Sequence, residues 1–308
     1  MRTCVIANPV AGQGRVRRLW PVLQSRLSAV VPELSYHWTA APGDGTALTR
    51  QALREGYRRI VMVGGDGTFH EVVNGFFADD GTALAPSAQL VPLPCGTGTD
   101  FRRALGLPAG VDAIPLVQSE RVRTVDLLRV MYTTPNGAQR HRYALNIVSF
   151  GLSSSVARHV NRSRLPLPGP TLRYLLPILR TLFTHRPRPV EISLDGTPLP
   201  PRPVRLVAVA NGPSFGAGIQ IAPTATVDDG LLDVTVLHDV PLWRLLWHAR
   251  RFYQGTHAPL SGISTYRGRR LTARAPDEPP VLLEADGELL GHLPATIEVV
   301  PQALRLQC

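Results

Sequence analysis

The sequence predicts a protein of the α/β class with two domains, an N-terminal α/β domain with a mainly parallel sheet and a C-terminal β-rich, sandwich-like domain. Over the first third of the 308 residues, apolar strand patterns alternate with helical ones, which is typical of a parallel sheet. From Arg123 onward, short apolar runs separated by turn residues replace this alternation and indicate a β-rich domain. We place the domain limits at 1–122 and 123–295, with a C-terminal strand segment over 296–308 that packs back on the first domain.

The individual elements follow from the spacing of apolar residues. In the first domain we expect strands and helices in alternation, over Thr3–Ala7, Arg15–Val31, Leu34–Thr39, Thr46–Glu55, Ile60–Val63, His70–Phe77 and Gln89–Leu93. In the second domain we expect strands over Val125–Met131, Arg142–Val148, Val190–Leu194, Val204–Ala210 and Leu231–Leu237, interrupted by helices over Thr171–Thr184 and Pro241–Tyr253.

All 33 basic residues are arginine, and together with 23 acidic residues they give a net charge of +10. The absence of lysine excludes Schiff-base enzymes, a Walker A loop and a protein kinase with its strand lysine. A pI near 10.5 indicates a polyanionic partner, such as nucleotide phosphate, nucleic acid or an anionic membrane surface. We expect no nucleic-acid binding, because the sequence lacks aromatic stacking platforms and a basic helix-turn-helix pattern.

The spacing of the cysteines and the length of the apolar runs indicate the cellular compartment of the protein. The three cysteines stand far apart, which argues against a disulfide framework and a cysteine-based zinc site. The longest interval without a charged residue, Leu206–Val227, is broken by glycine and proline and cannot span a bilayer. We therefore expect a cytoplasmic protein that at most contacts the inner face of a membrane. A second copy of the chain is a further candidate partner.

The strongest local pattern is a glycine-rich turn, Gly64–Thr68, between the expected strand Ile60–Val63 and a helix. The backbone N–H groups of such a turn and of the helix N-terminus form a cradle for anions such as phosphate. Glycine lets the backbone approach the phosphate, Thr68 offers a hydroxyl, and Asp66 can hold a magnesium ion or a ribose hydroxyl. The alternative is a tight strand-to-helix turn with a threonine cap, which three glycines make less favourable.

Two further glycine loops follow neighbouring strands. Pro94–Phe101 comes after the strand Gln89–Leu93, and Asn8–Gly14 comes after Thr3–Ala7. Because the carboxyl ends of parallel strands meet at one edge of a sheet, we expect the loops to open at that edge, where α/β sheets bind ligands. The loop Asn8–Gly14 alone is a weak signal, since Arg17 stands where a dinucleotide fingerprint has its third glycine.

Taken together, these motifs resemble the diacylglycerol kinase catalytic-domain family of lipid kinases, and in particular its soluble bacterial members. The resemblance rests on Asn8-Pro9 with its glycines, Gly64–Thr68, Pro94-x-Gly96-Thr97 and a late Asp286-Gly287-Glu288, in the family's order and approximate spacing. The loop Gly64–Thr68 alone is shared with NAD kinases and phosphofructokinases, so only the full set is specific. The resemblance implies a nucleotide-binding first domain, a β-sandwich-like second domain for the lipid, and an ATP site in the cleft between them.

For function, the resemblance implies an ATP-dependent lipid kinase that transfers the γ-phosphoryl group to a hydroxyl of diacylglycerol or a similar lipid. It places ATP around Asn8, Thr39, Gly64, Gly65, Asp66, Gly67, Thr68, Phe69, His70 and Thr97. It implies a structural Mg²⁺ held by the carboxylate of Asp229 and the backbone carbonyls of Thr226 and Leu231, with Asp126 tying that network to the active site. Asp286 and Glu288 would act on the acceptor hydroxyl, and either can be the base.

Several alternatives stay open beside this interpretation. The family usually has asparagine where this chain has Thr99, and often where it has His70, so we expect an altered nucleotide affinity rather than a lost site. NAD kinase is one rival function, and a nucleotide- or lipid-binding protein without turnover is another. By pattern alone, Asp286-Gly287 is a β-hairpin turn, which is compatible with presenting carboxylates to a substrate.

The expected helix Pro241–Tyr253 has leucines and Phe252 at helical spacing, with its arginines largely on another face. One interpretation is contact with a membrane interface through its Trp and Arg side chains. The other, which the pattern favours, is packing against the core of the second domain.

Overall fold

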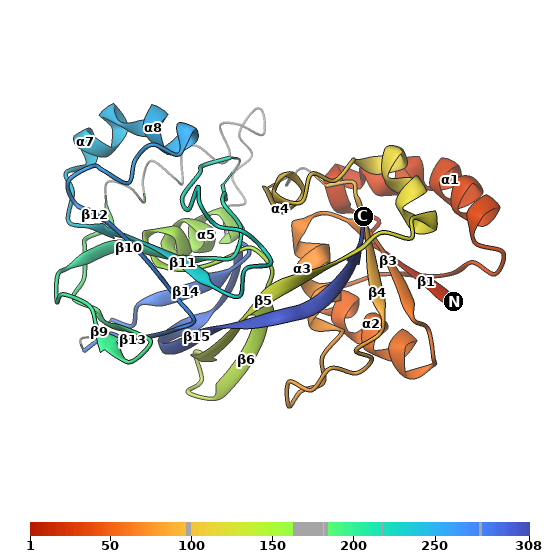
Figure 1. Cartoon of the computed structure of the whole chain (residues 1–308), viewed down its shortest axis with the longest axis horizontal. Helices are drawn as coiled ribbons and strands as arrows, with labels where there is room; N and C mark the ends of the chain where they lie inside the picture. The colour runs from red at the N-terminus through yellow and green to blue at the C-terminus, as the bar shows by residue number, and fades with distance from the viewer. Residues whose placement is uncertain (97–99, 163–180, 182–183, 217, 277–278) are drawn as a thin grey trace. The chain divides into compact units, whose positions relative to one another are not determined.

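The structure is a computed structural model of the chain (Figure 1). It describes all residues except 97–99, 163–180, 182–183, 217 and 277–278, so the expected helix Thr171–Thr184 falls almost entirely outside the described residues. The chain divides into two compact units. The first comprises Met1–Leu127, Val227–Asp229 and Val300–Cys308, and the second comprises Leu128–Thr226 and Gly230–Val299.

The first unit is built on a parallel sheet with the strand order β4-β3-β1-β2. Its elements are β1 (Thr3–Ala7), α1 (Ala11–Val30), β2 (Ser35–Trp38), α2 (Asp44–Arg54), β3 (Arg59–Gly64), α3 (Asp66–Asn74), β4 (Gln89–Pro94), α4 (Asp100–Ala104) and the 3-10 helix η1 (Gly110–Gln118). Helices α1 and η1 cover one face of the sheet, and α2 and α3 cover the other (Figure 1). The alternating strand and helix pattern therefore predicted this unit correctly.

The register between β1 and β3 explains why one face of the sheet packs on α1. Val5 and Ala7 of β1 lie beside Val61 and Val63 of β3, and all four side chains are buried. They contact the buried stripe of α1, which consists of Val16, Trp20, Leu23 and Leu27. These stripe residues recur every three to four positions, as expected for a helix with one apolar face.

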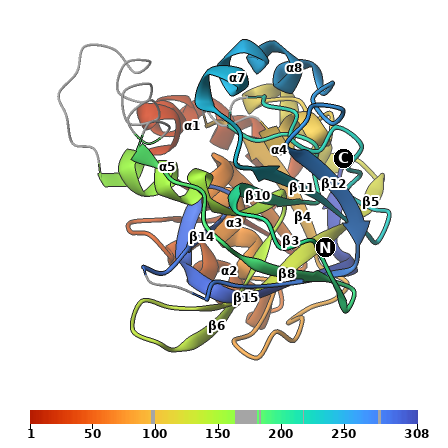
Figure 2. The same cartoon turned by 90° about the vertical axis from the view of Figure 1, so that its left-hand side faces the viewer.

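The second unit is a mainly antiparallel β-sandwich (Figure 2). Its own elements are β6 (Gln139–Ala144), β7 (Ile147–Gly151), α5 (Leu152–Arg162), β8 (Glu191–Leu194), β9 (Thr197–Pro198), β10 (Val204–Ala210), β11 (Leu232–His238), α7 (Leu242–Trp247), α8 (Ala249–Gln254), β12 (Ile263–Gly268), β13 (Arg270–Arg274) and β14 (Leu282–Ala285). Apolar side chains of β7, β10, β11 and β14 pack against those of β8, β13 and the strand β5 (Val122–Thr133) in one core. The short apolar runs after Arg123 thus correspond to the strands of a β-sandwich, as predicted.

Two long strands contribute residues to both units. They are β5 (Val122–Thr133) and β15 (Glu288–Gln307). The beginning of β15 pairs with β14 and then with β13, whereas Arg305 and Leu306 pair in parallel with β4 of the first unit.

Two expected elements are divided in the structure. The expected strand Arg142–Val148 is two strands, β6 and β7, with a turn at Leu145 and Asn146 whose backbone N–H groups bind a carboxylate described below. The expected helix Pro241–Tyr253 is broken at His248 into α7 and α8. Among the described residues, no helix is both long enough and apolar enough to cross a membrane.

His257 is expected to make the stability of the fold sensitive to acid. Its ring is buried, stacks on Phe252 and contacts the carbonyl of Ile221, and burial lowers its pKa. Because the fold favours the neutral ring, its contribution is complete above pH ~6.5, the unfolded pKa, and is lost as the pH falls below it. His257→Gln keeps a donor for Ile221 but cannot be protonated. The fall in melting temperature between pH 7.5 and 5.5 should be smaller in this variant, and identical falls would contradict the assignment.

Candidate functional site

The loop between β3 and α3 leaves backbone donors at the end of the sheet. Helix α3 begins at Asp66 with Gly65 as its N-cap, and within the described part of the chain no side chain caps it. The first N–H groups of a helix have no partner inside the helix, so they are available to an anion. Gly65, Asp66 and Gly67 are half-buried, whereas Thr68 is buried below them. The accessible part of the loop is thus mostly backbone.

The three glycine loops come together at the carboxyl edge of the sheet. The N–H groups of Cys95 and Gly96 donate to the Gly64 carbonyl over 2.7 and 3.1 Å. A Cβ on Gly96 would overlap the Cα of Gly65, and a Cβ on Gly12 would stand 2.7 Å from the carbonyl oxygen of Cys95. These contacts leave no room for side chains at positions 12 and 96, so glycine is required there.

Asn8 links the loop after β1 to the loop between β3 and α3. Its backbone N–H donates to Val63 over 2.9 Å, and its side-chain Nδ2 donates to Thr68 Oγ1 over 3.0 Å. Its Oδ1 accepts the N–H of Val10, which closes the turn after β1. Thr39 lies beside the same edge, where its N–H donates to the Ala7 carbonyl over 2.9 Å. The structure therefore brings together Asn8, Thr39 and the Gly64–Thr68 loop.

Of the remaining residues predicted around ATP, Phe69 and His70 have buried side chains on α3 and Thr97 is not described. Phe69 is buried with its ring 5.3 Å from that of Phe101, in a T-shaped contact. His70 is also buried, and its Nε2 lies 3.4 Å from Asn74 Nδ2. Both side chains hold α3 from its inner side. Thr97 falls outside the described residues.

The sequence analysis missed two carboxylates that fix the loop after β2. Asp44 Oδ2 accepts the N–H groups of Ala40 and Ala41 over 2.7 and 2.8 Å, and these bonds lower the pKa of Asp44. Glu71 accepts the N–H groups of Gly43 and Gly45 over 2.8 and 2.9 Å. The Asp-Gly pair at the start of the expected helix was the signal for Asp44, but no pattern connected Glu71 with residues 26 to 28 positions earlier.

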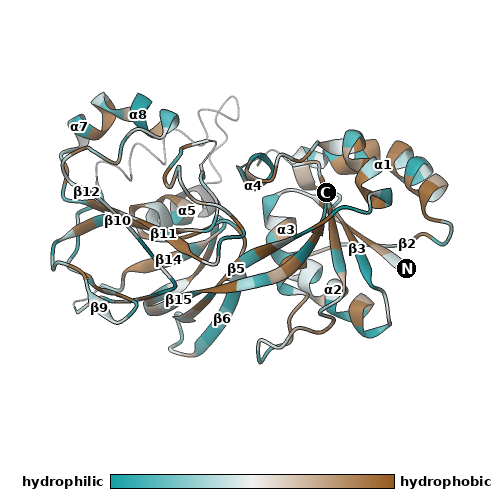
Figure 3. Cartoon of the chain, viewed as in Figure 1, coloured by the Kyte–Doolittle hydropathy of each residue, from teal (hydrophilic) through white to brown (hydrophobic). Residues whose placement is uncertain are grey.

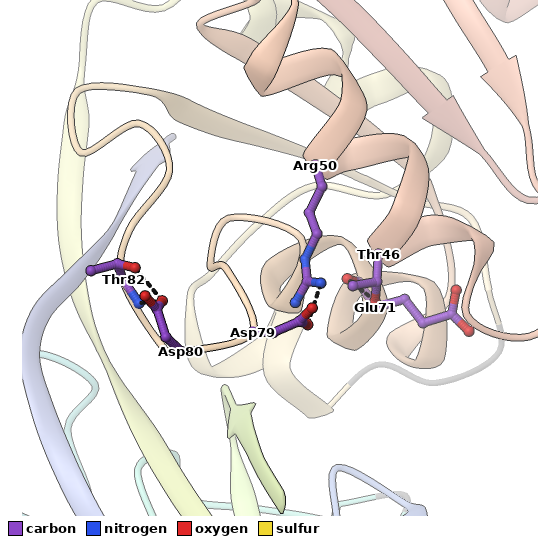
Figure 4. A network of polar contacts seen from close by, with 6 residues as sticks. All are labelled: Thr46, Arg50, Glu71, Asp79, Asp80 and Thr82. Atoms are coloured by element: carbon purple, nitrogen blue, oxygen red, sulfur yellow. Dashed lines mark hydrogen bonds and ion pairs between the residues drawn. The ribbon is translucent and has the colours of Figure 1, made fainter.

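Helices α2 and α3 are tied together by further polar contacts (Figure 4). Thr46 Oγ1 donates to the Glu71 carbonyl over 2.8 Å, and Arg50 pairs with Asp79 at 2.6 Å. Asp80 caps the following turn by accepting from Thr82. The contacts from α2 to α3 and the turn after it hold the helix that carries the anion cradle.

In the second unit, Asp286 lies in the hairpin turn between β14 and β15. Asp286 and Gly287 have φ angles of +50° and +88°, which are typical of a type I′ turn. The Asp286 carboxylate accepts three backbone N–H groups, from Leu145 over 2.9 Å, Asn146 over 3.0 Å and Ile147 over 3.1 Å. The hairpin prediction is correct, and the aspartate also clamps the β6–β7 turn.

Glu284 supports the same hairpin from inside and was not predicted. Its carboxylate is buried, binds Ser149 Oγ, and accepts the N–H of Gly287 over 2.8 Å. Ser149 Oγ in turn lies 2.5 Å from Ser153 Oγ. Glu288, by contrast, is exposed at the first position of β15. The turn thus holds one carboxylate among backbone donors and presents the other to solvent.

The predicted metal segment Thr226–Leu231 precedes β11 and is tied to β5. Asp126 is buried; its N–H donates to the Val227 carbonyl over 2.7 Å, and its Oδ1 accepts the N–H of Gln302 over 2.7 Å. Arg123 binds the Asp228 carboxylate through Nε at 2.9 Å and Nη2 at 2.8 Å. Asp229 is exposed in the next position. Asp126 therefore positions this segment, whatever the segment holds.

The chain thus combines a parallel α/β unit, in which glycine loops meet at one sheet edge, with a β-sandwich unit that carries an anchored acidic turn, and this two-unit arrangement matches families of kinases. Residues 2–130 match the diacylglycerol kinase catalytic domain, and residues 146–308 match the YegS C-terminal NAD kinase beta sandwich-like domain. The chain belongs to the diacylglycerol kinase catalytic-domain family and is a lipid kinase, which is a phosphotransferase.

Individual relatives match along nearly the whole chain. A diacylglycerol kinase of Mycobacterium tuberculosis is 29% identical over 307 residues, which cover 99% of this chain and 94% of that protein. A protein of Stenotrophomonas maltophilia named "Probable lipid kinase YegS-like" is 30% identical, with 89% and 86% covered. The crystal structure of a diacylglycerol kinase from Bacillus anthracis superposes with a TM-score of 0.71 at 23% identity, covering 99% and 96%, which shows the shared fold.

Proposed function

We propose that the chain uses ATP to phosphorylate a hydroxyl group of diacylglycerol or a similar lipid. The observation that carries this proposal is the convergence of three glycine loops beside the N-terminus of α3, at the carboxyl edge of a parallel sheet. Such an edge suits the phosphates of a nucleotide, and membership of a lipid kinase family supports a lipid as the acceptor.

In this proposal the nucleotide phosphates lie against Gly65, Asp66 and Gly67, the accessible residues of the loop. Asn8 and Thr68 keep the loop in place through their mutual hydrogen bond. Because the chain has no lysine, backbone N–H groups and arginine neutralise the phosphate charge. A magnesium ion bound with ATP would share this task by neutralising phosphate charge.

For the acceptor side, we assign the base to Glu288 and a positioning role to Asp286. Both oxygens of Asp286 already accept backbone N–H groups, whereas Glu288 is exposed beside it. The lipid hydroxyl would give its proton to Glu288 as its oxygen bonds to the γ-phosphorus and ADP leaves. A single carboxylate suffices, because phosphoryl transfer depends mainly on positioning and charge neutralisation.

The segment Thr226–Leu231 is proposed to hold a structural magnesium ion. The Asp229 carboxylate and the carbonyls of Thr226 and Leu231 are hard oxygen donors, which Mg²⁺ prefers. Within the described residues, no group of three His, Cys, Asp or Glu side chains is placed to hold a metal, so backbone carbonyls would have to complete this site. The ion would stabilise the segment that Asp126 and Arg123 tie to β5.

Substitutions in the β3–α3 loop separate nucleotide binding from folding. Among the described residues, a Cβ on Gly65 would meet the Gly96 Cα alone, at 3.4 Å, and the φ of −102° at Gly65 suits any residue. Gly65→Val should therefore keep a melting temperature near that of the wild type but lower ATP affinity at least about tenfold, or ~1.4 kcal/mol, in calorimetric titration. Gly64→Ala is the matched control. Its Cβ would stand 2.5 Å from Thr68, so it should lose about 1–3 kcal/mol of stability. Undiminished ATP affinity in folded Gly65→Val would remove the nucleotide from this loop.

Substitutions in the acidic turn separate the base from the clamp. Glu288→Gln should lower turnover by about 10² to 10⁴ at saturating ATP and lipid, with unchanged ATP affinity and melting temperature. Asp286→Asn should lower both turnover and melting temperature, because its NH₂ group would face backbone donors.

The assay follows labelled phosphate from ATP into vesicles that contain diacylglycerol, phosphatidylglycerol or a sphingoid base, with NAD in a parallel reaction. Label in NAD but in no lipid would replace the proposal with NAD kinase, and near-normal turnover of Glu288→Gln would reject the base.

Two neighbouring aspartates provide the test for magnesium. Wild-type protein should melt at a higher temperature with Mg²⁺, because an ion bound only by the folded state stabilises it. Asp229→Ala should abolish this increase. Asp228→Ala should keep it, since that residue is engaged by Arg123. An equal response of both variants to Mg²⁺ would place the ion elsewhere.

A further inference from the structure

Helices α7 and α8 expose large apolar side chains on one face. The exposed fractions are 69% for Trp243, 50% for Leu246, 80% for Trp247 and 56% for Tyr253. We call these four residues the α7–α8 face. Few other large apolar side chains among the described residues are exposed to this extent, and none of those is aromatic. The two helices lie side by side on the outside of the end of the sheet formed by β10, β11 and β12 (Figures 1 and 2).

The exposure of this face is a consequence of how the opposite face is anchored. Leu245 and Phe252 pack against the buried cluster that contains Leu237 and Val240. The Phe252 ring stacks on His257 with centroids 4.6 Å apart, and the Phe252 carbonyl accepts the N–H of Gln220 over 2.9 Å. Among the described side chains of the two helices, the expectation of packing against the core is therefore correct for Leu245 and Phe252. Since they fix the rotation of the helices, Trp243 and Trp247 are held outward.

The charged residues of the two helices are all of one sign. Arg244, Arg250 and Arg251 lie on the same two helices, and residues 240–276 contain seven arginines and no Asp or Glu. The preceding carboxylate, Asp239, is paired with Arg205 at 3.2 Å. Hydrophobic and hydrophilic residues alternate along α7 and α8 in Figure 3. The face therefore combines tryptophan and leucine with arginine and lacks acidic neighbours in the chain.

We propose that the α7–α8 face docks on an anionic lipid membrane. Tryptophan and tyrosine favour the boundary between headgroups and acyl chains, and arginine is attracted to anionic headgroups. With six residues each, the helices are too short to span a bilayer and suited to lie in its interface. A second copy of the chain fits this face poorly, because arginines would oppose arginines. The role of the α7–α8 face as the place where the enzyme meets its acceptor rests on the proposed lipid kinase function. Membrane binding itself requires no turnover.

Sedimentation with vesicles tests the docking directly. The full chain should bind vesicles of phosphatidylcholine with phosphatidylglycerol, bind phosphatidylcholine alone at least about tenfold more weakly, and lose binding as salt is raised. Trp243→Ser/Trp247→Ser should lower the partition coefficient at least about tenfold. Arg250→Gln/Arg251→Gln should lower it about fivefold for each charge, on anionic vesicles only. Val22→Ser and Arg26→Gln, exposed positions of α1, are the matched controls and should bind like the wild type.

Two further measurements distinguish this inference from the proposed function. The tryptophan variant should bind ATP and phosphorylate a monomeric short-chain diacylglycerol like the wild type, while its activity on vesicle-embedded diacylglycerol falls. Loss of membrane binding with intact ATP binding isolates the docking face, whereas vesicle binding without ATP binding in the wild type would reject only the kinase proposal. Equal binding of wild type and tryptophan variant to anionic vesicles, no binding by either, or concentration-dependent dimers that the variant abolishes would overturn the docking proposal.

Discussion

The architecture of the first unit depends on contacts between backbones that no side chain separates. Gly12, Gly64 and Gly96 each stand where a Cβ would overlap a neighbouring loop or the first turn of α3. Because these loops follow β1, β3 and β4, their contact can exist only when the strands are parallel and in register. The sheet thereby places backbone N–H groups at one edge. The preference of this edge for anions comes from peptide dipoles rather than from flexible cationic side chains. In the proposed function, these N–H groups do at the phosphates what lysine does in other kinases.

Carboxylates in this protein serve repeatedly as acceptors for backbone N–H groups. Asp44, Glu71, Glu284 and Asp286 each bind at least one backbone N–H from a loop or turn, and Asp126 binds the N–H of Gln302 in β15. A carboxylate has two oxygens with several lone pairs, so one side chain can fix a whole turn. Such residues hold the loops and turns of both candidate sites in place. Substitution of these residues would therefore change stability and activity together.

The sequence supported the fold better than it supported the roles of individual residues. Parallel strands such as Thr3–Ala7 follow directly from apolar runs between glycine turns, and the structure has the same limits for that strand. The turn that splits Arg142–Val148 was missed, because its cause is Asp286, about 140 positions later. Phe69 and His70 follow the glycine motif but lie on the buried side of α3, a direction that adjacency in sequence does not reveal. Contacts distant in sequence thus set the limit of what the pattern could predict.

The sharing of β15 has a consequence for synthesis. The first unit includes residues 300–308, which pair with β4 only after the entire segment 128–299 has left the ribosome. Until then β4 has an unpaired edge, which is open to wrong strand partners. Domains usually fold in order from the N-terminus, but here the earlier unit must wait for the later one. We therefore expect fragments that end before residue 300 to aggregate rather than to yield an isolated nucleotide-binding unit.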